Sequence, residues 1–198
     1  MTRVSCNIST SVDGFVAGPR QSLENPIGEG GMRLHEWHFN PQGEDRTILD
    51  EWQQMPGAYV MGRNMFDPGR GEWDLEWKGW WGDEPPYHAP VFVLTHHSRE
   101  PLPMDGGTTF HFVTDGIESA LEQAKAAADD KRVEIAGGAS TVNAYLHAGM
   151  IDELHMHISP VLLGTGERLF DGVSDTLRLE PVQVIGSPAV THVKYRVG

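Results

Sequence analysis

The stretch from Val133 to Leu146 (V-E-I-A-G-G-A-S-T-V-N-A-Y-L) most constrains how this chain can fold. Its first four residues form a short, mostly apolar run that predicts a buried strand, and two glycines lead directly into a helix with apolar periodicity. The glycines allow a sharp turn and a close backbone approach, and the free N–H groups of the helix favour an anion. The stretch predicts either a phosphate site or a simple turn in which Ser140 or Thr141 is the N-cap.

Two earlier apolar runs end in a similar way. Ala58 to Met61 (A-Y-V-M) continues into G-R-N-M-F, and Val91 to Leu94 (V-F-V-L) continues into T-H-H-S-R. An arginine beside a glycine suits a phosphate, because its planar fork donates two hydrogen bonds at once. The carboxyl ends of parallel strands lie at one edge of an α/β sheet, where ligands bind. Together the three strand ends predict a site long enough for a dinucleotide.

The N-terminal half supplies further candidates for a site. Arg3 to Ser9 predicts a first strand, and Asp13 after it lies either in a hairpin turn with Gly14 or at the mouth of a pocket. Residues 19–42 form a long loop, and because such loops are commonly lids, Trp37 is a candidate for lining a substrate site. Asp45 lies near the first turn of a predicted helix over residues 44–55, where an acidic residue also favours the helix dipole.

Residues 67–90 change in composition to glycines, prolines and four tryptophans, Trp73, Trp77, Trp80 and Trp81. Clustered aromatic residues can stack on a flat ligand as a lid, or can close a dimer interface. We interpret this segment as an insertion loop and leave both roles open.

The C-terminal part predicts an antiparallel edge. Residues 115–130 predict a helix, whereas residues 152–160, 177–185 and 191–197 predict three successive strands without helices between them. Such a succession is typical of an antiparallel edge on an otherwise parallel sheet. We therefore expect an α/β fold with a mixed, mostly parallel sheet, in a single domain over residues 1–198.

Composition excludes several classes of function. The net charge of -13, with no basic cluster, disfavours nucleic acid and anionic membrane surfaces as partners. The single cysteine, Cys6, excludes an internal disulfide and is expected to be buried. No third ligand accompanies either His96 and His97 or His155 and His157, so we expect no metal site. No signal peptide or membrane span is predicted, and we expect a soluble cytoplasmic protein.

In the order and spacing of its motifs, nearly the whole chain resembles the dihydrofolate reductase-like family. Within that family it is most similar to the reductase domain of bacterial riboflavin biosynthesis (the RibD C-terminal domain) and its stand-alone relatives. The motifs are S-V-D-G-F-V-A at residues 11–17, V-M-G-R-N-M-F at 60–66, V-L-T at 93–95, A-G-G-A-S-T at 136–141, and I-D-E-L followed by P-V-L-L-G-T-G at 151–166.

The resemblance implies a sheet of about eight strands with helices on both faces, and NADPH bound along its carboxyl edge. It also implies a cis peptide between Gly137 and Gly138 and a catalytic role for Asp13. The cofactor residues that it implies are Val16 and Ala17 at the nicotinamide, Gly62, Arg63, Asn64, Met65, Phe66, Gly137, Gly138, Ala139, Ser140 and Thr141 at the pyrophosphate and ribose, and Thr95, His96, His97, Ser98 and Arg99 at the 2′-phosphate.

The predicted function is an NADPH-dependent reductase that transfers a hydride to a small heterocyclic or carbonyl substrate. One alternative is a riboflavin-pathway ribosylaminopyrimidine reductase or dihydrofolate reductase. For dihydrofolate, Arg46 falls nearest the place of the family's substrate acid, and Asp45 fits only with a shift of one residue. The other alternative is a non-catalytic nucleotide-binding dimer. We also expect a homodimer, because Val182, Val184, Val193 and Tyr195 lie on late strands that no later element covers.

Overall fold

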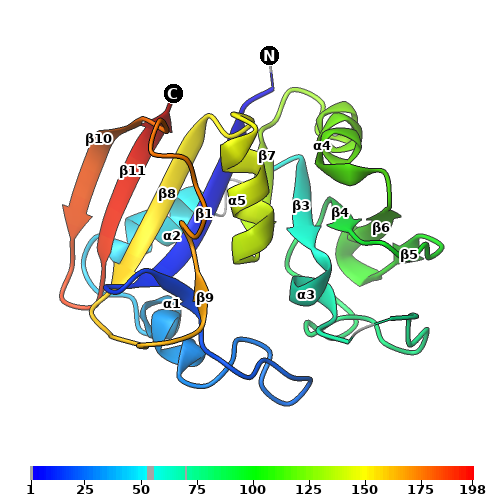
Figure 1. The fold of residues 1–198 in the computed structure, drawn as a ribbon, viewed down its shortest axis with the longest axis horizontal. Helices are drawn as coiled ribbons and strands as arrows, with labels where there is room; N and C mark the ends of the chain where they lie inside the picture. Colours follow the sequence, from blue (N-terminus) through cyan, green and yellow to red (C-terminus); the bar gives the residue numbers. More distant parts are fainter. Residues whose placement is uncertain (1, 53–55, 70) are drawn as a thin grey trace.

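The computed structural model describes residues 2–52, 56–69 and 71–198, and its centre is a nine-stranded sheet (Figure 1). The order across the sheet is β10-β11-β8-β1-β7-β3-β4-β6-β5, and a separate pair joins β2 to β9. The strands are β1 (Val4–Ser11), β2 (Phe15–Ala17), β3 (Ala58–Gly62), β4 (Pro90–Leu94), β5 (Leu102–Pro103), β6 (Thr109–Val113), β7 (Val133–Gly137), β8 (Glu153–Ser159), β9 (Glu167–Arg168), β10 (Leu179–Gly186) and β11 (Thr191–Val197).

The six central strands, from β8 to β6, run parallel to one another. β11 pairs antiparallel with β8, β10 pairs antiparallel with β11, and β5 pairs antiparallel with β6 at the far edge. The mostly parallel sheet with an antiparallel C-terminal edge is therefore confirmed. The sheet puts the carboxyl ends of β1, β7, β3 and β4 side by side.

One face of the sheet is covered by α4 (Gly116–Ala127) and α5 (Ala139–His147). Alternate residues of β1, among them the fully buried Cys6, point into this first core because successive side chains of a strand face opposite sides. The hydroxyl of Tyr145 on α5 donates to the backbone oxygen of Ile117 on α4 at 2.7 Å, which ties the two helices together.

The opposite face carries two separate coverings. Next to β1 and β8 lie η1 (Gly31–Leu34), α1 (Glu36–Phe39) and α2 (Asp45–Trp52); residues 53–55, where α2 was predicted to end, lie outside the described residues. Over β3, β4 and β6 a second core contains Phe66, at the end of α3 (Arg63–Phe66), and Phe110. The short η2 (Asp105–Gly107) follows β5. Helices thus cover both faces, as predicted.

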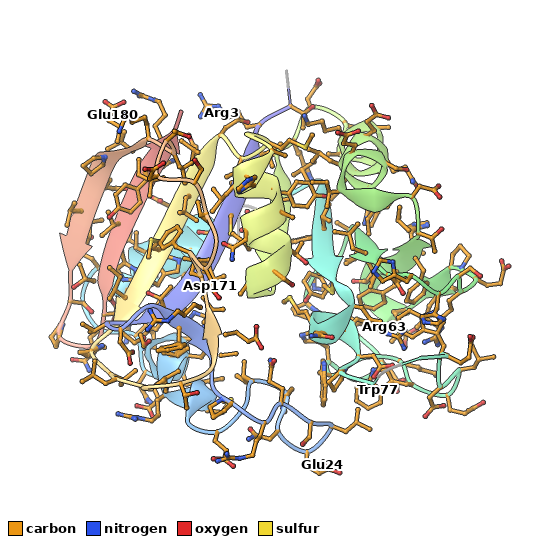
Figure 2. The ribbon with its side chains drawn as sticks, in the orientation of Figure 1. Arg3, Glu24, Arg63, Trp77, Asp171 and Glu180 are labelled. Carbon is orange, nitrogen blue, oxygen red and sulfur yellow. The ribbon has the colours of Figure 1, made fainter. Side chains whose placement is uncertain are left out.

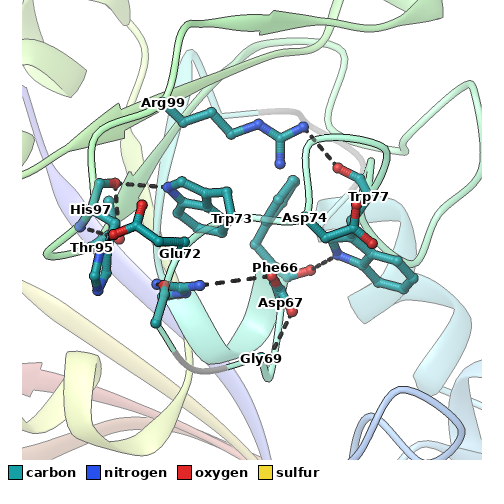
Figure 3. Close-up of polar contacts among 12 residues, drawn as sticks. Phe66, Asp67, Gly69, Glu72, Trp73, Asp74, Trp77, Thr95, His97 and Arg99 are labelled. Carbon is teal, nitrogen blue, oxygen red and sulfur yellow. Dashed lines mark hydrogen bonds and ion pairs between the residues drawn. The ribbon is translucent and has the colours of Figure 1, made fainter.

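The tryptophan-rich segment packs on the second core. The indole N–H of Trp73 donates to the backbone oxygen of His97 at 2.8 Å, and that of Trp77 donates to the backbone oxygen of Phe66 at 2.8 Å (Figure 3). These bonds join the segment to the ends of β3 and β4.

The C-terminal edge exposes less apolar surface than its sequence predicts. Val193 is buried and Tyr195 packs against the first core, whereas Val182 and Val184 on β10 are exposed. The homodimer remains a prediction. Across the described ranges, every helix is too short or too polar to cross a membrane.

Candidate functional site

A cavity of about 1350 Å³ follows the carboxyl ends of the parallel strands. Its walls come from β1, β2, β3 and β7, from the N-terminus of α5, and from the loops at residues 19–42 and 67–90. Figure 2 shows Arg63 at this edge, with the loop that carries Glu24 and the segment that carries Trp77 below it. Fourteen of the predicted site residues line the cavity: Val16, Ala17, Gly62, Arg63, Asn64, Met65, Thr95, His96, His97, Gly137, Gly138, Ala139, Ser140 and Thr141.

The turn from β7 into α5 faces the cavity. Gly137 has a φ of 127°, which favours glycine, and its peptide bond to Gly138 is cis, so that prediction is confirmed. The N-cap is Gly138 rather than Ser140 or Thr141, and no side chain caps this end. The uncapped N–H groups of α5 are therefore free to bind an anion in the cavity.

The end of β3 fits tightly against α5. A Cβ atom on Gly62 would lie 2.4 Å from Oγ1 of Thr141, so only glycine allows this approach. The next residue, Arg63, stacks its guanidinium 4.0 Å from the ring centroid of Trp73 and donates from Nη1 to the backbone oxygen of Gly71 at 2.6 Å. Its Nε and Nη2 are buried without a hydrogen-bond acceptor among the described residues, and the carboxylate of Asp67 forms only a long ion pair, with Oδ2 3.9 Å from Nη2. A phosphate oxygen would satisfy both.

Two residues after β4 do not belong to the site. Thr95, His96 and His97 line the cavity, but Ser98 does not and is exposed. Arg99 points to the tryptophan-rich segment, where its Nη2 donates to the backbone oxygens of Leu75 and Trp77 at 3.0 and 2.9 Å (Figure 3). Arg99 does not line the cavity, because its guanidinium holds the segment, and its role at the 2′-phosphate stays a prediction.

Phe66 is likewise outside the cavity. Its side chain is fully buried in the second core, with ring centroids 4.9 Å from Phe110 and 5.3 Å from Phe112. The residue is the last of α3, and its side chain is directed away from the ligand edge. Its predicted cofactor role is replaced by a packing role.

Asp13 also has a structural role. Its carboxylate accepts hydrogen bonds from the backbone N–H groups of Leu163 and Gly164 at 3.2 and 2.7 Å, and it does not line the cavity. A hydrogen bond from the Ser11 hydroxyl, together with these N–H groups, lowers the pKa of Asp13 to about 2, so the group is not a proton donor at neutral pH. The chain turns here, but not as a hairpin, since β2 pairs with β9.

The two predicted substrate residues, Trp37 and Asp45, lie behind the cavity wall. Trp37 is 2% exposed; its indole N–H donates to Oγ of Ser9 at 3.3 Å, and its ring packs 4.8 Å from that of His157. Asp45 is fully buried and accepts a hydrogen bond from Nε2 of His192 at 3.0 Å. Neither residue lines the cavity, because each side chain is buried against partners in strands of the sheet, and both assignments stay predictions.

The sequence reasoning missed the inner end of the cavity. This region, called the inner end below, is lined by Asn7 and Ser9 of β1, Tyr59 of β3, Glu134 of β7, and two histidines of the long loop, His35 and His38. A carboxylate within a buried strand was the available signal, since glutamate is almost never fully buried without partners.

The histidines of the inner end are neutral at pH 7. Burial lowers the pKa of His35, and burial together with the neighbouring His35 and His192 lowers that of His38 to about 3. Burial raises the pKa of the Glu134 carboxyl, although hydrogen bonds from Ser5 and Asn7 oppose this effect. The inner end is thus suited to a polar ligand without charge, whereas the strand ends with Arg63 suit an anion.

Metal chemistry has no support within the described residues, where no group of three or more His, Cys, Asp or Glu side chains could hold an ion. The pair of adjacent histidines, His96 and His97, belongs to the cavity wall instead.

Comparison with known proteins gives consistent matches. The family model of the RibD C-terminal domain matches residues 2–191. The uncharacterized protein YyaP of Bacillus subtilis strain 168 is 32% identical over 182 residues, which are 91% of this chain and 86% of that protein.

Solved structures show the same fold at lower identity. A protein of Shewanella sp. PV-4 named for riboflavin biosynthesis has a TM-score of 0.69 at 23% identity, covering 100% of this chain and 99% of its own. The diaminohydroxyphosphoribosylaminopyrimidine deaminase/5-amino-6-(5-phosphoribosylamino)uracil reductase of Thermotoga maritima has 0.62 at 17% identity, covering 98% and 56%. Dihydrofolate reductase of Enterococcus faecalis, complexed with NADP(H), has 0.56 at 13% identity, covering 99% and 96%.

Proposed function

Because the chain belongs to the RibD C-terminal domain family, which supports a reductase role, we propose that it is an NADPH-dependent reductase. The proposed reaction transfers a hydride to a small conjugated heterocycle or carbonyl compound. The observation that carries the proposal is one continuous cavity with an anion-binding edge and an inner end that no positively charged side chain lines.

The residues of the strand ends fit a dinucleotide. The N-terminus of α5 and the Nε and Nη2 atoms of Arg63 would bind the pyrophosphate, and Gly62 lets the end of β3 lie close to Thr141 of α5. His96 and His97 remain as partners for a 2′-phosphate, since Arg99 is turned away.

NADPH, when bound, supplies the hydride. The chain supplies orientation and shelter from water, because Val16 and Ala17 border the nicotinamide end while Trp80 and Trp81 close the cavity from the tryptophan-rich segment. The carboxylate of Asp13 is hydrogen-bonded to the backbone at Leu163. We therefore assign delivery of the proton to water that reaches the inner end.

Direct titration with NADPH tests the proposal, followed by its oxidation in the presence of a panel of heterocycles and carbonyl compounds. Arg63→Met should weaken NADPH at least about tenfold, because a hydrogen-bonded charge on a phosphate is lost. Arg46→Met, an exposed arginine on α2, is the matched control and should leave the affinity unchanged. A parent protein that does not bind NADPH at millimolar concentration would refute the proposed function.

A further inference from the structure

Glu134 is a buried carboxylate to which the proposed function gives no role. It is 2% exposed and is the second residue of β7, the strand that leads to the cofactor edge. Its Oε2 accepts a hydrogen bond from Oγ of Ser5 at 2.6 Å and lies 3.8 Å from Nε of Arg132. A carboxylate removed from water in this way is costly unless its partners compensate, so the arrangement calls for a reason.

The carboxylate lies where β1 and β7 separate. The two strands are paired only at Val4 with Val133 and at Ser5 with Glu134, whereas β1 stays paired with β8 as far as Ser11. Beyond Ser5 the N–H of Asn7 has no strand partner on the β7 side, and Oε1 of Glu134 accepts its hydrogen bond at 2.7 Å. The opening between the two strands forms part of the cavity wall.

The same oxygen determines how the side chain of Asn7 is turned. Nδ2 of Asn7 donates to Oε1 of Glu134 at 2.8 Å. Because Oε1 accepts this hydrogen bond, the amide presents its NH₂ group to Glu134 and its oxygen elsewhere. Asn7 lines the cavity, and among the described residues none donates to its Oδ1. An oriented acceptor therefore faces the inner end.

The surroundings of this acceptor carry no positive charge. His35 and His38 are neutral, Ser9 and Tyr59 are uncharged, and no lysine or arginine of the described chain lines the inner end. A phosphate or carboxylate on the substrate would have no partner here. An uncharged molecule with an N–H group would satisfy Oδ1 of Asn7.

We propose, on the basis of the proposed function, that Asn7 is the specificity-determining residue of the inner end and that Glu134 is its positioning residue. The substrate class is an uncharged, planar heterocycle that presents an N–H donor to Oδ1 of Asn7. An analogue without that N–H leaves the acceptor unpaired, which is how buried polar groups discriminate between similar molecules.

Two flat probes test the proposal: pteridine-2,4-dione, which has two N–H donors, and its 1,3-dimethyl derivative, in which methyl groups replace both; each is titrated by calorimetry into the protein. The parent should bind the N–H compound about tenfold more tightly than the methylated one. In Asn7→Leu and Asn7→Ser the two affinities should become equal, while the backbone N–H of residue 7 keeps its bond to Glu134.

Variants of Glu134 separate positioning from other roles. Glu134→Gln should keep the preference, because its amide oxygen still accepts from Asn7, whereas Glu134→Leu should lose it. Melting temperature and NADPH affinity, measured on every variant, identify one that has not folded. Equal affinities in the parent, binding of neither probe, or an unchanged preference in both Asn7 variants would overturn the inference.

The outcome for the cofactor is independent of this result. A parent that distinguishes the probes but does not bind NADPH would support the inference and refute the proposed function. A parent that binds NADPH but binds the two probes equally would support the proposed function and refute the inference.

Discussion

Removing the carboxylate of Asp45 should destabilise the fold substantially, although this residue lies outside the cavity. In Asp45→Ala, Nε2 of His192, which is 4% exposed, loses the only hydrogen-bond acceptor that the described residues give it. The N–H of Gln42 also loses its acceptor at 2.9 Å, at the start of α2. A buried hydrogen bond to a charged group contributes about 1.5–3 kcal/mol and a helix-end bond about 1 kcal/mol, so the expected loss is about 3 kcal/mol.

For a chain of this length, that loss corresponds to a fall in melting temperature of roughly 6–12 °C. Differential scanning calorimetry of the parent, Asp45→Ala, Asp45→Asn and Asp50→Ala measures it. Asp50 is exposed on the same helix and serves as the matched control. Asp45→Asn should lose less than Asp45→Ala, because its amide oxygen still accepts from His192. If Asp45→Ala melts within about 2 °C of Asp50→Ala, the buried Asp45–His192 contact does not stabilise the protein.

Four further outcomes are expected. The pKa of His38 is lowered from 6.5 to about 3, so the neutral side chain contributes fully to stability above pH 6.5 and the contribution is lost as the pH falls toward 3. The expected loss in the free energy of unfolding is about 2 kcal/mol at pH 5, measured by denaturant titrations at pH 7 and pH 5. Arg99→Ala should lower the melting temperature but weaken NADPH and NADH equally, as judged by binding titration. Gly62→Ala should weaken NADPH at least about tenfold in the same titration, because its Cβ would displace Thr141. Light scattering at micromolar concentration should give the mass of a homodimer.

Each of these has a contrary result. Equal stability at pH 7 and pH 5 would mean that His38 is hydrated and titrates normally. Selective loss of NADPH in Arg99→Ala would return that residue to the 2′-phosphate site. Gly186→Ala, at a position open to solvent, is the control for Gly62→Ala, and equal effects of the two would contradict the close approach of β3 and α5. A monomeric mass would refute the predicted homodimer.

The fold and the cofactor edge could largely be predicted, because periodicity and glycine positions are local signals. The strand ends at Gly62, Thr95 and Gly137 line one cavity because parallel strands place them at a common edge. The direction of a side chain within a loop, in contrast, depends on residues far away in the sequence. Trp37 and Arg99 point away from the cavity because they have partners in other elements that no spacing in the sequence reveals.

The inner end was missed for a related reason. Asn7 and Glu134 interrupt apolar runs, but each run as a whole still predicts a strand, so the pattern does not mark the two residues as part of a site. Their meeting depends on β1 lying next to β7, which is a property of the topology. A polar residue within a buried strand is therefore the more useful signal when the neighbouring strand is unknown.

The position of β1 also bears on how the chain folds. The first strand of the chain lies between β7 and β8, so Val4 pairs with Val133 and Ser5 pairs with Glu153. Such pairings across long stretches of chain form slowly, because the loop must close before the contacts are made. During synthesis one edge of β1 can pair once β7 has left the ribosome, whereas the other edge stays unpaired until β8 has followed. A nascent chain that stops before residue 150 therefore lacks β8, and the free edge of its N-terminal strand is open to wrong pairing.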